Sequence, residues 1–85
     1  MSSHFEDLWE EGENSIDPET TIEEVISELE IKYSILKNIV RSGLKGEDRN
    51  QAVGLAMGSF LKSLSYLSMK ENINVYAALK ESLKS

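Results

Sequence analysis

The chain has 85 residues, a net charge of −6, 40% hydrophobic residues and no cysteine. This length allows one small domain with a thin core, and the lack of cysteine excludes disulfides, zinc–thiolate sites and thiol catalysis. Net acidity argues against nucleic-acid or anionic-membrane partners, because both require a basic surface. The N-terminus lacks a signal-peptide pattern, and polar residues interrupt the longest apolar stretch, Ala52 to Leu67. We therefore expect a cytoplasmic protein that binds neither nucleic acid nor membrane.

Charge divides the chain into two unequal parts. Residues 1–31 contain eleven acidic side chains and no lysine or arginine, whereas all nine basic residues follow, from Lys32 on. The first part therefore carries a charge of −11 and the second +5. An acidic front end of this kind suits contact with a basic surface, either in the later half of the chain or on a partner.

The first predicted element is a short helix in an acidic segment, residues 1–16, which precedes a helical domain at residues 17–85. Ser3 and Glu6 have the spacing of a capping box, and Gly12 predicts the end of the helix. Residues 13–17 form a linker. Three apolar side chains then share one face, at positions i, i+3 and i+4: Phe5, Leu8 and Trp9.

The second predicted element is a long helix that ends at Gly43. It begins at Asp17-Pro18 or at one of two overlapping capping boxes, those of Thr20 and Thr21. Ile31 and Ile35 project roughly opposite its main apolar row, which indicates a second neighbour, in so short a chain another subunit. The main row follows steps of four and three residues, as in a coiled coil: Ile22, Ile26, Leu29, Tyr33, Leu36 and Val40.

A third helix is predicted from Glu47 or Asp48 to Lys70. Gly54 and Gly58 lie beside its apolar row, and a glycine inside a helix costs about 1 kcal/mol relative to alanine. Two of them, four residues apart, indicate close approach of another backbone; a locally bent helix is the alternative. The apolar row again follows steps of four and three: Val53, Met57, Phe60, Leu64 and Leu67.

A last helix is predicted from Val75 to Leu83, with Asn74 as its N-cap. Its inner face would contain Val75, Ala78, Leu79 and Leu83. Together the elements predict an all-α fold: a small helical bundle built on a long antiparallel helical hairpin, with short N- and C-terminal helices.

Residues 47–83 carry two motifs, Gly58-Ser59-Phe60-Leu61 inside the third helix and Asn72-Ile73-Asn74-Val75-Tyr76-Ala77-Ala78-Leu79 at the break before the last. In their order and spacing they resemble the C-terminal half of the all-α, MazG-like nucleotide pyrophosphohydrolases. The acidic metal ligands of that family would fall on Ala56 and Ser59, and the family's first-helix Glu-Glu-x-x-Glu pattern is missing. The resemblance therefore implies a dimeric helix bundle without catalytic residues, metal or cofactor.

The leader sequence Phe5-Glu6-Asp7-Leu8-Trp9-Glu10-Glu11 resembles the acidic Phe-x-x-Leu-Trp peptides of transcriptional activation domains. Those peptides bind as amphipathic helices in an apolar groove. Two alternatives stay open, because the apolar side chains could instead pack on the chain's own core or on a second subunit. The resemblance implies a set of partner-binding residues: Phe5, Leu8, Trp9, Glu6, Asp7, Glu10 and Glu11.

The remaining candidates for chemistry have plainer interpretations. Four carboxylates of the second helix could suggest magnesium, but the facing helix supplies no acid between Asn50 and Lys70, so they predict a solvated face: Glu23, Glu24, Glu28 and Glu30. His4 is interpreted as a surface histidine. Three basic residues near the turn would compensate the helix dipole or contact the acidic leader: Arg41, Lys45 and Arg49.

We therefore predict a non-enzymatic protein-interaction or regulatory module, homodimeric, that acts on another protein through its acidic N-terminal segment. The predicted dimer interface contains Ile31, Ile35, Gly54 and Gly58. One alternative is a divergent MazG-like pyrophosphohydrolase. Another is an acidic decoy that occupies the nucleic-acid site of a basic protein.

Overall fold

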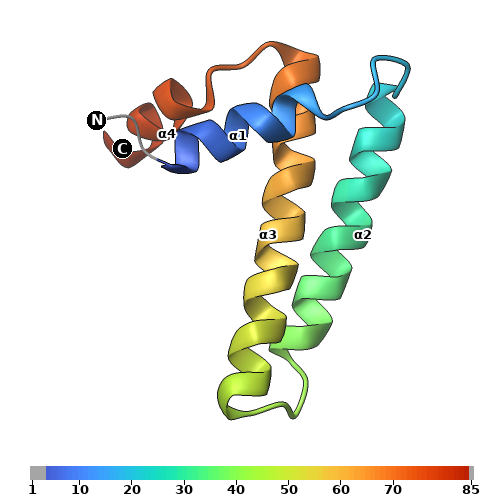
Figure 1. Cartoon of the computed structure of the whole chain (residues 1–85), viewed down its shortest axis with the longest axis vertical. Coiled ribbons are helices and arrows are strands. Elements are labelled where there is room, and N and C mark those ends of the chain that lie inside the picture. The colour runs from blue at the N-terminus through green and yellow to red at the C-terminus, as the bar shows by residue number, and fades with distance from the viewer. Residues whose placement is uncertain (1–3, 85) are drawn as a thin grey trace.

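The computed structural model describes residues 4–84, which form four α-helices and no strand: α1 (His4–Asn14), α2 (Ile22–Val40), α3 (Gly46–Glu71) and α4 (Val75–Lys84). Helices α2 and α3 run side by side in opposite directions, and α1 and α4 project sideways from the end of this pair at which α3 finishes (Figure 1). The predicted all-α class is thereby confirmed. Ser3, the predicted cap of the first helix, lies outside the described residues.

The start of α2 is set by one of the two overlapping capping boxes, that of Thr21. The Thr21 hydroxyl accepts a hydrogen bond from the backbone N–H of Glu24 at 3.1 Å, and a Glu24 carboxylate oxygen accepts one from the Thr21 N–H at 3.3 Å. Both bonds satisfy donors that a helix start would otherwise leave without partners. At the other end, the N–H of Arg41 bonds the carbonyl of Lys37 at 3.0 Å and closes the helix.

The contact between α2 and α3 uses a different row of side chains from the predicted one. The prediction is wrong for Ile26, Tyr33, Val40 and Met57, which are 40%, 54%, 45% and 50% exposed. A row of buried and half-buried residues on each helix instead follows steps of three and four. On α2 this row contains Ile22, Val25, Leu29, Lys32, Leu36 and Ile39, and on α3 it contains Val53, Ala56, Phe60, Ser63 and Leu67.

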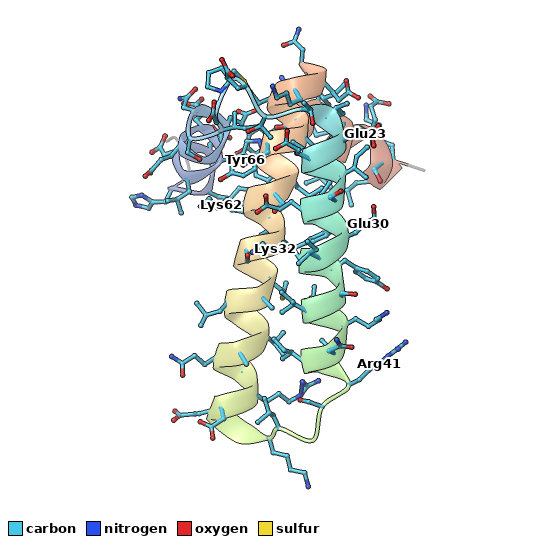
Figure 2. The ribbon with its side chains drawn as sticks, turned by 90° about the vertical axis from the view of Figure 1, so that its right-hand side faces the viewer. Glu23, Glu30, Lys32, Arg41, Lys62 and Tyr66 are labelled. Atoms are coloured by element: carbon cyan, nitrogen blue, oxygen red, sulfur yellow. The ribbon has the colours of Figure 1, made fainter. Side chains whose placement is uncertain are left out.

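Small side chains on α3 explain this shift. Ala56 and Ser63 are 6% and 1% exposed, so α2 can approach α3 closely along them and bury Val25 to 1%. Lys32 lies half-buried in the same row, between the two helices (Figure 2), where the aliphatic part of its side chain can cover apolar surface. The result is a contact that leaves Ile26, Tyr33 and Val40 of α2 and Met57 of α3 outside it.

Helix α1 does not end at Gly12 as predicted, but continues to Asn14. A Cβ atom placed on Gly12 would lie 2.5 Å from the Ser65 hydroxyl oxygen and 3.2 Å from its Cβ. Gly12 is therefore the residue that lets α1 cross α3 closely. By contrast, a Cβ on Gly54 or on Gly58 would have nothing within 4 Å, so the close approach predicted for these two glycines does not occur within the chain.

Helix α4 begins as predicted but packs less than predicted. Asn72 ends α3 in the left-handed conformation (φ 55°), and the Asn74 side-chain oxygen accepts a hydrogen bond from the N–H of Ala77 at 3.1 Å. No residue of α4 is buried. The predicted inner face is wrong for Ala78, Leu79 and Leu83, which are all exposed, Leu79 to 54% and Leu83 to 76%, because α4 projects sideways from α3 and does not lie along it (Figure 1).

Candidate protein-binding surface

The three apolar side chains of α1 have different environments. Trp9 is 7% exposed, so it packs within the chain and is not available to a foreign groove while α1 stays in place. Of the alternatives for this residue, packing on the chain's own core is the one the structure shows. Phe5 and Leu8 remain 49% and 64% exposed. They are the apolar members of the predicted binding set that a partner could reach.

Contacts on both sides hold α1 in position. The Phe5 ring stacks on Trp9 at a centroid distance of 6.1 Å and meets the ring of Tyr76 in α4 edge-on at 6.5 Å. At the opposite end of α1, the Ser68 hydroxyl donates a 2.7 Å hydrogen bond to the carboxylate of Glu13. These contacts attach the acidic helix to α3 and α4 and fix the direction of its exposed side.

An open pocket of about 380 Å³ lies between α1 and α3. Its α1 wall includes Phe5, Leu8 and Trp9, and its α3 wall includes Gly58 and Leu61. Because Gly58 has no side chain and nothing else occupies the space above it, the pocket reaches the α3 backbone. At its rim, Glu11 and Lys62 provide one charge of each sign, and Figure 2 shows Lys62 on the side of the hairpin that carries α1.

The exposed side of α1 is strongly acidic. Of the five carboxylates within its eleven residues, Glu6, Asp7, Glu10 and Glu11 are exposed and Glu13 is half-buried against Ser68. Their field acts on Tyr76, whose pKa is raised first by burial and then by the charges of Glu6, Glu10, Glu13 and Asp7. The pocket is thus an apolar opening beside a negative helix.

The other predicted candidates give no second site. Within residues 4–84, no three His, Cys, Asp or Glu side chains are grouped so that they could hold a metal ion. His4 and all four α2 carboxylates are exposed, as expected: Glu23, Glu24, Glu28 and Glu30. The basic residues Arg41, Lys45 and Arg49 belong to the turn end of the hairpin, far from α1, so their predicted contact with the leader is not made within the chain (Figure 1).

The four predicted dimer residues do not form one surface. Ile31 and Ile35 are exposed on one flank of α2, at 58% and 44%. Gly54 and Gly58 are exposed on α3, on the side where the pocket and α1 lie. At 100° per residue these two pairs point to different sides of the hairpin. The sequence reasoning also missed the α1–α3 pocket and the role of Gly12, since both depend on a contact between residues more than fifty positions apart.

Two further results bear on the class of protein. In the part of the chain that the structure describes, none of the helices has the length and apolar content needed to cross a membrane. Comparisons with models of known protein families, with curated proteins and with solved structures found no match.

Proposed function

We propose that this chain is a non-enzymatic, homodimeric protein-interaction module that binds a basic segment of another protein through α1 and the pocket beside it. The observation that carries this proposal is the open apolar pocket at the edge of a helix with five carboxylates. A partner segment of complementary chemistry would place an apolar side chain in the pocket and lysine or arginine side chains along α1.

The size and lining of the pocket fit this role. A volume of about 380 Å³ falls at the lower end of the range of binding pockets, roughly 300–1,000 Å³. It can therefore accept a single large anchor side chain, and anchors of this kind supply much of the affinity in many interfaces. The acidic side chains around it would speed association with a basic partner and make binding weaken as salt is added.

A synthetic probe tests the proposal directly. The probe is a lysine-rich helical peptide with one leucine as its anchor, and its control is the same peptide with alanine in place of that leucine. We expect titration calorimetry to detect binding of the first peptide only, with affinity that falls as salt is raised. Neutral or acidic peptides with the same leucine should not bind.

Two exposed leucines provide matched variants for this assay. Leu8→Asp places a charge in the pocket wall, whereas Leu55→Asp makes the same change on α3 outside the pocket, at a residue that is 71% exposed. Leu8→Asp should abolish binding and Leu55→Asp should leave it unchanged. Equal effects of the two variants would refute the pocket as the anchor site. If only the neutralisation of Glu6, Asp7, Glu10 and Glu11 removes binding, charge alone is responsible and the chain acts as an acidic decoy.

A further inference from the structure

The side chains that the α2–α3 contact leaves out form a second apolar face of the hairpin. Ile26, Tyr33 and Val40 are spaced by seven residues along α2 and are 40–54% exposed. On α3, Met57 is 50% exposed and Leu64, seven residues later, is half-buried. Spacing by seven keeps residues close to one line along a helix, so α2 carries an apolar row of three residues and α3 one of two residues beside the contact row.

The direction of these rows is the same on both helices. The contact row and the exposed row together form one apolar stripe on each helix. At 100° per residue, the centre of this stripe is rotated by roughly 45° from the line along which α2 and α3 touch, and the rotation has the same sense on both helices. Because the two helices run antiparallel, both rotations lead to the same side of the hairpin. In a four-helix bundle each helix directs its apolar stripe to the bundle axis, midway between its two neighbours. The hairpin therefore has the side-chain pattern of half a bundle.

The surface area and the dimensions of the chain support this interpretation. The chain exposes 6614 Å², whereas a compact monomer of its mass would expose roughly 5,100 Å². Its radius of gyration is 14.4 Å, against roughly 12 Å for a compact chain of this length. The excess of roughly 1,500 Å², to which the projecting helices α1 and α4 contribute as well as the open face (Figure 1), exceeds the surface of about 800 Å² that each partner buries in a typical stable complex.

We infer that a second copy of this chain covers the open face, and that the two hairpins form an antiparallel four-helix bundle. The face of each copy consists of Ile26, Tyr33 and Val40 of α2 with Met57 and Leu64 of α3. This inference deepens the homodimer part of the proposed function and does not involve the α1 pocket. It replaces the predicted interface, because Ile31 and Ile35 lie on the other flank of α2 and stay outside the bundle.

The charges along α2 select the orientation. Glu23 and Glu30 lie beside the open face in the first half of α2, and Lys37 and Arg41 lie beside it near the other end; Figure 2 shows Glu23, Glu30 and Arg41 on the same side of the helix. A two-fold axis across the helices packs α2 against the partner's α2 head to tail, so each acidic half meets a basic half. A two-fold axis along the helices would instead place the acidic first halves of both α2 helices at the same end of the bundle.

The first experiment measures mass by light scattering for the full chain and for two matched double variants. We expect a dimer for the unchanged chain and a monomer for Ile26→Glu with Tyr33→Glu. Ile31→Glu with Ile35→Glu should remain dimeric, with the helical signal in circular dichroism preserved in both. A monomer from the second pair together with a dimer from the first would overturn the inference and restore the predicted interface. A monomeric unchanged chain would overturn the dimer altogether, while peptide binding in the α1 pocket would still test the rest of the proposed function.

The second experiment measures orientation without disturbing the interface. The chain has no cysteine, so Ser34→Cys and Ser42→Cys each allow one spin label per copy, and both serines are exposed. Moving the label from Ser34 in α2 to Ser42, which directly follows the C-cap Arg41, shifts it by about 12 Å in each copy. In the antiparallel bundle the distance between labels along the bundle axis should therefore grow by about 24 Å from the Ser34 pair to the Ser42 pair. Equal distances for the two pairs would refute the antiparallel orientation.

Discussion

Because Gly12 lies close to Ser65, replacement of a glycine by alanine should change the free energy of unfolding in opposite directions at Gly12 and at Gly58. In Gly12→Ala the new Cβ would lie 2.5 Å from the Ser65 hydroxyl oxygen, closer than a side chain can tolerate. Ser65 is 1% exposed, and its hydroxyl donates a 2.6 Å hydrogen bond to the carbonyl of Lys62. The strain can be relieved only if Ser65 leaves this bond or if α1 moves away from α3.

The magnitude follows from two opposing terms. Overpacking costs about 1–3 kcal/mol, whereas replacing a helical glycine by alanine returns about 1 kcal/mol. We therefore expect Gly12→Ala to lower the free energy of unfolding by about 1 kcal/mol, and by up to about 2 kcal/mol if the Ser65 hydrogen bond is lost as well. Gly58→Ala meets nothing within 4 Å, so only the propensity term acts there and the variant should be more stable by about 1 kcal/mol.

Urea unfolding followed by circular dichroism, at one protein concentration for all variants, measures the difference between the two substitutions. Trp9 is the single tryptophan of the chain and is buried, so its fluorescence reports separately whether α1 moves. We expect a shift of the emission to longer wavelength in Gly12→Ala and no shift in Gly58→Ala. Equal stabilisation by both substitutions, with unchanged emission, would refute the close packing of α1 on α3.

Three further predictions concern single residues. Thr21→Ala removes the hydroxyl that accepts a hydrogen bond from the Glu24 N–H at the start of α2, while the backbone N–H of residue 21 can keep its bond to the Glu24 carboxylate, and it should cost about 1 kcal/mol in urea unfolding; Thr20→Ala, which removes no capping hydrogen bond, serves as its control and should have a smaller effect. Ser68→Ala removes the 2.7 Å bond to Glu13 together with the 2.8 Å contact to the Ser65 carbonyl and should cost about 1–2 kcal/mol, and a Glu13→Ala variant that loses as much would attribute this cost to the contact with Glu13. Tyr76 should ionise above its ordinary pKa of 10.0 because its half-buried side chain is partly desolvated and because four nearby carboxylates oppose its negative charge, so ultraviolet titration should lose a tyrosine step above pH 10 in Tyr76→Phe. Because the pKa of Tyr76 is higher in the folded than in the unfolded chain, the neutral side chain contributes to the stability of the fold at pH values below the unfolded pKa. This contribution should be lost as the pH rises through the folded pKa.

Features that depend on neighbouring residues could be predicted from the sequence. The helix start at Asn74 follows from capping chemistry within three residues, and the same chemistry narrows the start of α2 to Asp17-Pro18, Thr20 or Thr21, among which the structure selects Thr21. The all-α class follows from the spacing of the apolar residues. The division of charge needed no structure either, because it is a property of the order of residues.

Features that depend on the partner helix could not be predicted in the same way. Two apolar rows flank Ile22, Leu29 and Leu36 on α2, and the more apolar one, with Ile26 and Tyr33, is the one left exposed. The small buried residues of α3, Ala56 and Ser63, determine which row of α2 packs, because α2 can approach α3 closely only along them. The glycines show the same limit, since the residues that approach a glycine closely can lie anywhere in the sequence. Gly12 was expected to end a helix and instead meets Ser65, while Gly54 and Gly58 meet nothing.

The contact of α1 with the far end of α3 also sets an order of events during synthesis. Glu13 bonds Ser68, 55 residues later in the chain, so α1 leaves the ribosome long before the surface that receives it exists. At a typical rate of 5–20 residues per second, this interval lasts about 3–11 s. During that time Phe5, Leu8 and Trp9 have no partner in α3 or α4, whereas α2 can pair with the first half of α3 as soon as that half emerges. The helix that is made first can therefore dock only after pairing of α2 and α3 can begin, and its acidic side chains help to keep it in solution until then.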